Sequence, residues 1–161
     1  MYKYFLFLTI LLFGCVNTKN NVVVENEESA KVAVFKYAFN SYAESIKNKE
    51  LSYFFIEVEN HEPSVHFLNN FTDQNPKVTG ISYSKIKCGD FSASANEVKH
   101  KVDGKAGVIV SLHKLQKISD TKYEVSFSSI RNCLGGGGFN GFVEFENGVW
   151  VVTQIENTWV S

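Results

Sequence analysis

An Asn-Gly dipeptide at positions 147–148 narrows the choice of fold more than any other feature of this sequence. Both residues accept the positive φ angles of a type I′ turn, and alternating apolar runs flank them, which predicts a β-hairpin. A two-residue turn sets the register, so that Phe145 faces Trp150 and Val143 faces Val152. One face of the hairpin is therefore aromatic and aliphatic, and we expect it to be covered.

Further strands are predicted before this hairpin. Residues 123–128 alternate apolar with polar side chains, which indicates a half-buried strand, and a Ser-Asp-Thr turn at 119–121 precedes it. Residues 106–117 carry the apolar run 108–110, and an Asp-Gly dipeptide at 103–104 joins this segment to an arm at 97–102. The last third of the chain thus predicts four or five antiparallel strands.

One amphipathic helix is expected upstream of the sheet. Asn26 or Ser29 can cap its first turn. Apolar side chains then recur at three- and four-residue spacing, at Val32, Phe35, Phe39, Tyr42 and Ile46. We expect this stripe to pack on the apolar face of the hairpin.

The segment between helix and sheet is predicted to hold a strand at 51–58, a short helix at 62–71 that starts near Pro63, and a further strand at 78–86. The short helix would bury Val65, Leu68 and Phe71. The predicted fold is α+β: one long N-terminal helix packed on a curved antiparallel sheet of about five to six strands, with one short extra helix. This order is similar to the cystatin-like and NTF2-like folds, and that likeness implies no function.

The N-terminus is typical of an exported protein. A weakly positive start is followed by an apolar run at 4–13, which is shorter than the roughly 20 residues that a membrane-spanning helix needs. Gly14 before Cys15 is similar to a lipobox, the bacterial signal that is cleaved before a cysteine that then receives acyl chains. An ordinary signal peptide with an incidental cysteine is the alternative.

Cleavage at this point would divide the chain into three parts: a lipoprotein signal peptide at 1–14, a lipidated Cys15 with a flexible tether over 15–26, and a single α+β domain over 27–161. Stable anchoring needs more than one acyl chain. We therefore expect acylated Cys15 to hold the protein on a membrane of the bacterial cell envelope, inner or outer.

The charge balance disfavours a nucleic-acid partner. The chain has 16 basic and 17 acidic residues, a net charge of −1, and Arg131 is its one arginine. Because arginine suits bidentate phosphate contacts, both the balance and the choice of basic residue argue against nucleic-acid binding.

Two cysteines remain after Cys15, at positions 88 and 133. In an exported chain an even remainder predicts a disulfide between Cys88 and Cys133. Two separate buried thiols are the alternative. A catalytic cysteine is disfavoured, because nothing in the sequence ties a histidine to either one.

Two motifs lack the context that ligand chemistry requires. The glycine run predicts a bulge or wide turn and a possible binding loop, formed by Leu134, Gly135, Gly136, Gly137, Gly138 and Phe139. No Lys-Ser or Lys-Thr follows it, so it is not a P-loop. His61 and His66 are five residues apart, a spacing that does not put both on one face of a helix. We expect no metal and no cofactor.

Several motifs of the C-terminal half resemble an uncharacterised family of small exported bacterial (lipo)proteins. They are the turn at 117–121, Cys133 with its glycines, the Gly-x-Trp hairpin at 147–152 and the final Trp-Val-Ser. The resemblance covers residues 80–161 and places Cys88 where relatives have an upstream cysteine. Relatives often have two cysteines where this chain has one cysteine and extra glycines. The family implies no activity.

Our leading hypothesis is a lipid-anchored envelope protein whose domain is a non-enzymatic module that binds an unknown protein or small molecule. One alternative is a small enzyme or ligand-binding protein with an NTF2-like pocket between helix and sheet, for which His113, Glu124 and Tyr42 are candidates. The other is an inhibitor or immunity-type protein that acts through the glycine-rich loop. Converging polar side chains would favour the enzyme, and a protruding loop would favour the inhibitor.

Overall fold

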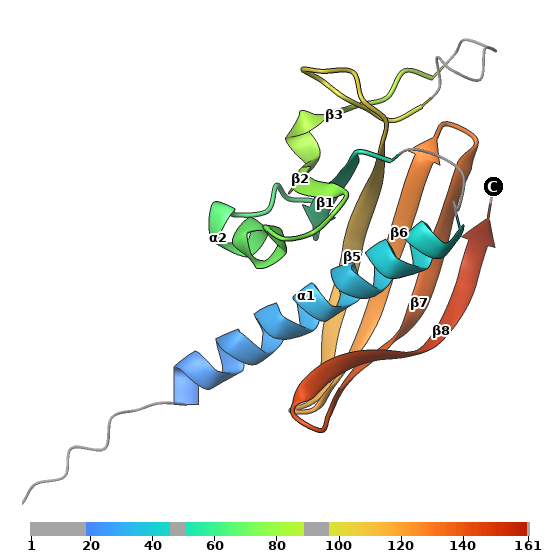
Figure 1. The fold of residues 1–161 in the computed structure, drawn as a ribbon. Helices are drawn as coiled ribbons and strands as arrows, with labels where there is room; N and C mark the ends of the chain where they lie inside the picture. Colours follow the sequence, from blue (N-terminus) through green and yellow to red (C-terminus); the bar gives the residue numbers. More distant parts are fainter. Residues whose placement is uncertain (1–18, 46–50, 89–96, 161) are drawn as a thin grey trace, which may run out of the picture.

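The computed structural model describes residues 19–45, 51–88 and 97–160. Over these residues the chain is α+β, with a mixed six-stranded sheet and two α-helices (Figure 1). The predicted signal peptide at 1–14, Cys15 and Ile46 lie outside the described residues.

The large sheet has the strand order β2-β1-β5-β6-β7-β8. Its strands are β1 (Tyr53–Val58), β2 (Lys77–Gly80), β5 (Gly107–Ser119), β6 (Lys122–Asn132), β7 (Gly135–Glu146) and β8 (Val149–Val160). Strands β5 to β8 form the predicted antiparallel meander. The hairpin register is confirmed, because Phe145 pairs with Trp150 and Val143 with Val152.

The expectation of an entirely antiparallel sheet is wrong, because β1 runs parallel to both β2 and β5. Parallel pairing requires a crossover connection of a dozen or more residues, and residues 59–106 between β1 and β5 supply one. The alternation of apolar and polar side chains along a strand does not indicate whether that strand pairs parallel or antiparallel to its neighbours. In this interior position Phe54, Phe55 and Ile56 are all buried, so β1 is covered on both faces.

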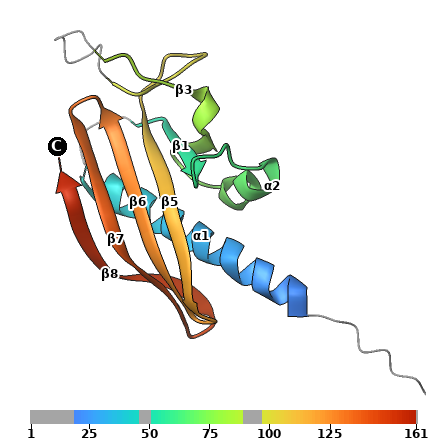
Figure 2. The same ribbon diagram turned by 180° about the vertical axis from the view of Figure 1, so that it is seen from behind.

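Helix α1 (Lys19–Ser45) lies across one face of the sheet, and Figure 2 shows the strands from the opposite side. It begins upstream of the predicted caps, within the segment that we expected to be a tether. Phe35 and Phe39 are fully buried, as predicted, in a core that also includes Val143. Trp150 and Val152 pack against this core.

The second helix is shorter than predicted, and of its three expected core residues Phe71 is buried, Leu68 is partly buried against the core and Val65 is exposed. Helix α2 (Val65–Leu68) continues as a 3₁₀ turn, η1 (Asn69–Phe71), and its N-cap is Ser64, whose side chain accepts a hydrogen bond from Phe67 N–H. Phe71 is buried as predicted, but Val65 is exposed and Phe67 takes its place. Because capping starts the helix at Val65, positions 67 and 71, one turn apart, face the core.

A small second layer lies against the other face of β1. It consists of η2 (Ile81–Tyr83), β3 (Ser84–Lys85) and β4 (Lys99–His100), and β3 pairs with β4. The His100 ring stacks on Tyr53 with ring centroids 4.4 Å apart and lies 6.1 Å from the Phe55 ring. The predicted strand at 78–86 is thus divided between β2 in the large sheet and β3 in this layer.

Candidate functional site

A groove of about 540 Å³ lies between α1 and the turn end of the β7–β8 hairpin. The helix contributes Val32, Ala33, Lys36 and Tyr37, and the hairpin contributes Phe145, Trp150 and Val152. We call it the α1–hairpin groove. A pocket between helix and sheet belonged to the alternative hypothesis of a small enzyme or ligand-binding protein.

Aromatic side chains form the sheet-side wall of this groove. The Trp150 ring lies edge-on to Tyr123, with centroids 5.3 Å apart, and 5.2 Å from the Phe145 ring. Trp150 Nε1 is buried, with no hydrogen-bond partner among the residues that the structure describes. The sheet-side wall is therefore aromatic and aliphatic, with one indole N–H.

The mouth of the groove carries a single charge. Among the described residues that line it, Lys36 is the one charged side chain, and none is Asp, Glu, His or Cys. The groove therefore offers apolar surface with one cation and, among the described lining residues, no carboxylate, imidazole or thiol, which suits an apolar body that has an anionic end.

Lys36 and Tyr37 fall outside the predicted apolar stripe, so the sequence pattern did not indicate them. Helical periodicity identified the face of α1 that enters the core. The open side of the groove depends on where the β7–β8 hairpin ends relative to the helix, and local sequence does not encode that.

A second hollow, of about 380 Å³, lies between α1 and the turn after β1. Lys31 Nζ lies 2.8 Å from Glu27 Oε1 and 3.3 Å from Glu59 Oε2. Burial opposes the charged form of Lys31, but these two carboxylates outweigh it and raise the pKa of Lys31. Because its cation is already paired within the fold, this hollow holds α1 to the turn and is the weaker candidate for a ligand site.

The three candidate enzyme residues have different partners and do not converge. His113 Nε2 lies 2.8 Å from Ser128 Oγ, whereas Glu124 forms an ion pair with Lys114 at 2.7 Å. Tyr42 lies on α1 at the edge of the core. Burial raises the pKa of the Tyr42 phenol, and a neighbouring arginine partly opposes this shift.

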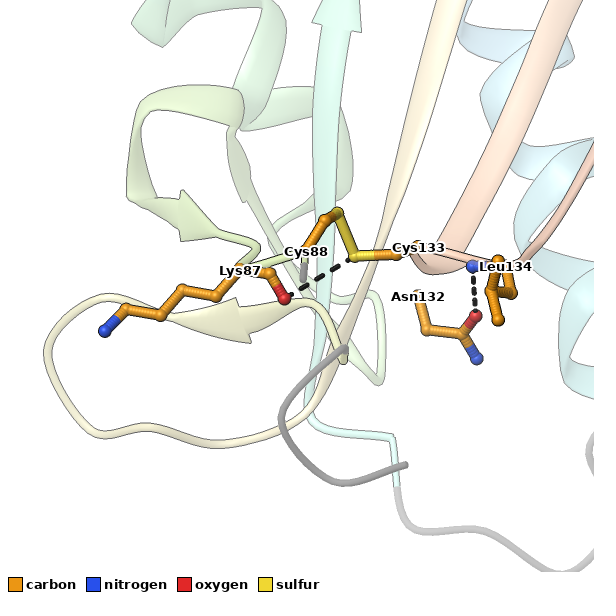
Figure 3. Close-up of a disulfide and its surroundings, with 5 residues drawn as sticks. All are labelled: Lys87, Cys88, Asn132, Cys133 and Leu134. Carbon is orange, nitrogen blue, oxygen red and sulfur yellow. Dashed lines mark hydrogen bonds between the residues drawn. A yellow bond between two sulfur atoms is a disulfide. The ribbon is translucent and has the colours of Figure 1, made fainter. Parts of the chain in front are cut away.

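The predicted disulfide is confirmed. Cys88 and Cys133 are bonded, with their Cα atoms 5.6 Å apart (Figure 3). The bond ties the segment after β3 to the turn between β6 and β7. Asn132 shapes this turn, because its Oδ1 accepts a hydrogen bond of 2.9 Å from Leu134 N–H (Figure 3).

The glycine run does not form the expected loop. Gly135 to Phe139 are the first residues of β7 and pair with β6 on one side and, from Gly137 on, with β8 on the other, while Leu134 is exposed in the preceding turn. A Cβ on Gly138 would lie 2.1 Å from Trp159 Nε1, so glycine is what lets the indole lie against the strand. The predicted bulge is present, because the pairing register of β7 with β8 shifts between Gly138 and Phe139. The binding loop is not, because residues 135–139 belong to an extended strand.

Within the described parts of the chain, no group of three or more His, Cys, Asp or Glu side chains could hold a metal ion, and no helix is long and apolar enough to cross a membrane. No family model, curated protein or solved structure matches this chain. The resemblance to exported bacterial proteins stays a prediction.

Proposed function

We propose that this protein is a lipid-anchored protein of the bacterial cell envelope whose domain binds an amphipathic ligand in the α1–hairpin groove. The observation that carries the proposal is the groove itself, an aromatic wall that lies open beside the single cation of Lys36. Its volume of about 540 Å³ falls within the range of roughly 300–1,000 Å³ that is usual for small-molecule sites.

The ligand class follows from the lining. Phe145 is 41% exposed although it stands beside Trp150, so binding an apolar body would remove aromatic surface from water. A carboxylate or phosphate at one end of the ligand would pair with Lys36. The described lining has no Asp, Glu, His or Cys, and Lys36 and Tyr37 are its ionisable side chains, so the apolar wall favours binding over catalysis.

The envelope location is supported by the leader sequence and by the disulfide. The apolar run at 4–13 and the Gly-Cys junction match a lipoprotein signal. Disulfides persist in oxidising compartments and are rare in the cytosol, so the Cys88–Cys133 bond agrees with export. Acylation of Cys15 would then hold the domain on the membrane.

The anchor is tested by intact-mass measurement and membrane fractionation of the full chain expressed in bacteria. We expect the mature protein to start at Cys15 with two or three acyl chains and to sediment with membranes. A Cys15→Ala variant should be soluble and unacylated. Membrane association that survives this substitution, without acyl mass on the wild type, would refute the anchor.

The groove is tested with a fluorescently labelled long-chain fatty acid. Ala33→Trp fills the groove and should abolish binding, whereas Val102→Trp, at an exposed site away from the groove, should leave it unchanged. Lys36→Gln should weaken binding by a factor of roughly 1.4 to 5, the effect of an exposed ion pair worth about 0.2–1 kcal/mol. Lys105→Gln is the charge-matched control. Equal binding by Ala33→Trp and wild type would exclude the groove as the site.

A further inference from the structure

The turn ends of two hairpins meet at one end of the sheet. Phe145 N–H donates a hydrogen bond of 2.8 Å to Thr121 O, which joins the β7–β8 turn to the β5–β6 turn. In Figures 1 and 2, which are related by rotation about the vertical axis, both turns lie level with the start of α1 at the lower end of the molecule. The segment that carries Cys15 therefore joins the domain at this end.

Apolar side chains are exposed around this end. The exposed fraction is 55% for Ile118, 41% for Phe145, 58% for Val149 and 39% for Val151. We call these four residues the turn-end rim. Leu134, in the turn between β6 and β7, is exposed too, so exposure alone does not distinguish the rim. The rim differs because Phe145, Val149 and Val151 also line the α1–hairpin groove, which therefore opens here.

Two lysines near the rim are paired, whereas Glu146, at the β7–β8 turn, has no ion-pair partner among the described residues. Lys117 Nζ lies 2.7 Å from Asp120 Oδ1, and Lys122 forms an ion pair with Glu144 from the neighbouring strand. A surface with these paired lysines and with exposed aliphatic and aromatic groups suits the boundary between lipid headgroups and acyl chains better than it suits a strongly charged partner.

The reach of the chain agrees with this placement. Cys15 is the fourth residue before Lys19, where α1 begins. Four fully extended residues span at most about 14 Å. An acylated Cys15 would therefore hold the start of α1 close to the headgroups. Ten residues of helix, about 15 Å, separate Lys19 from Ser29 beside the groove, so the turn-end rim lies at the end of the domain nearest the membrane.

We propose that the turn-end rim rests on the bilayer and that the ligand of the α1–hairpin groove is a lipid acyl chain taken up from that bilayer. This inference rests on the proposed function and names the ligand class of the same groove. An opening that is apolar and faces the membrane lets an acyl chain enter the groove without passing through water. Exposing the chain to water is the main free-energy cost of moving a lipid out of a bilayer.

The two tryptophans of the chain provide an internal comparison. Trp150 lines the groove, whereas Trp159 lies near the other end of β8, against Gly136 and Gly138 of β7. The Trp159→Phe variant leaves Trp150 as the one reporter, and Trp150→Phe leaves Trp159. Bromine quenches indole fluorescence only at short range, so each variant reports whether acyl chains reach its remaining indole.

The experiment uses the full chain purified from bacterial membranes and reconstituted into vesicles of phosphatidylethanolamine and phosphatidylglycerol, with or without bromine on the acyl chains. We expect brominated lipid to remove most of the Trp150 emission and little of the Trp159 emission. Val149→Asp should reduce the quenching of Trp150, whereas Val102→Asp, away from the rim, should not. This second pair keeps the test decisive if either tryptophan variant is unstable.

The outcomes separate this inference from the proposed function. Unquenched Trp150, or equal quenching of both tryptophans, in vesicle-bound protein that still binds the labelled fatty acid would overturn the lipid assignment and leave the groove as a binding site. Protein that neither carries acyl chains nor binds vesicles would overturn the anchor, and this inference with it. Quenching confined to Trp150 and reduced by Val149→Asp would support it.

Discussion

Replacing Cys88 and Cys133 together by serine removes the cross-link between the segment after β3 and the β6–β7 turn. The two cysteines are 45 residues apart in the sequence. In the chain-entropy description, closing a loop of about this length lowers the entropy of the unfolded chain by about 13 cal/mol/K, which corresponds to about 4 kcal/mol at 25 °C. The loss would be a large part of the roughly 5–15 kcal/mol that stabilises a typical domain.

The structure also predicts where the loss is felt first. The closed loop contains β4, β5 and β6, and β5 and β6 are held by an extensive antiparallel ladder. The pairing of β3 with β4 has only two residue pairs, Ser84 with His100 and Lys85 with Lys99. Without the disulfide we expect the β3–β4 layer to exchange its amide hydrogens faster than the meander does, because few backbone hydrogen bonds hold it.

The measurement is urea unfolding, followed by circular dichroism, of the oxidised wild type, the reduced wild type and the double variant. Reduction and substitution should each lower the free energy of unfolding by about 4 kcal/mol. They should also lower the melting temperature by roughly 8–16 °C, at about 2–4 °C per kcal/mol for a domain of this size. Cys15→Ser should change neither value. A loss below about 1 kcal/mol, with the bond verified by thiol titration of the wild type, would refute the loop-closure reasoning.

Other contacts make further predictions. Gly138→Ala should lower the free energy of unfolding by about 1–3 kcal/mol, because the new Cβ would lie 2.1 Å from Trp159 Nε1; urea unfolding should show part of the loss recovered when Trp159→Ala is added. Phe39→Ala should cost about 3–5 kcal/mol, since the Phe39 ring is buried and stacks on Phe54 with centroids 4.3 Å apart; a loss below about 1 kcal/mol in urea unfolding would contradict the packing. Burial alone would raise the pKa of Asp103, but its hydrogen bonds outweigh this and lower the pKa from 3.8 to about 2. Folding therefore favours this carboxylate, whose contribution to stability is complete above pH 3.8 and is lost as the pH falls toward 2, so Asp103→Asn should flatten the decline of the urea midpoint across that interval.

Where sequence reasoning succeeded, the relevant physics was local. The Asn-Gly turn at 147–148 determined the register of the β7–β8 hairpin, and the bonded pair Cys88–Cys133 followed from a cysteine count in an exported chain. The buried stripe through Phe35 and Phe39 followed from helical periodicity. Each inference needed only neighbouring residues or a simple count.

The failures involve segments whose conformation depends on distant partners. The glycine run correctly predicted a bulge, at Gly138 and Phe139, but it also predicted a binding loop where the chain is a strand. No local signal shows that β6 and β8 would hold these residues extended and that Trp159 would lie against them. In α2, the cap at Ser64 set which residues face the core, and it exposed Val65. The sequence did not predict which residues line the groove. Lys36 and Phe145 are far apart in the chain, and only the packing of α1 on the sheet places both in its lining.

Turn chemistry, alternation and the helical period, all written in the sequence, determined that this chain forms one amphipathic helix and an antiparallel meander. The tertiary structure alone decided that β1 lies between β2 and β5 and runs parallel to both, and that α1 leaves a groove beside the β7–β8 turn. The physical reason is range: backbone dihedral preferences act between adjacent residues, whereas strand order reflects contact free energies between segments far apart in the chain.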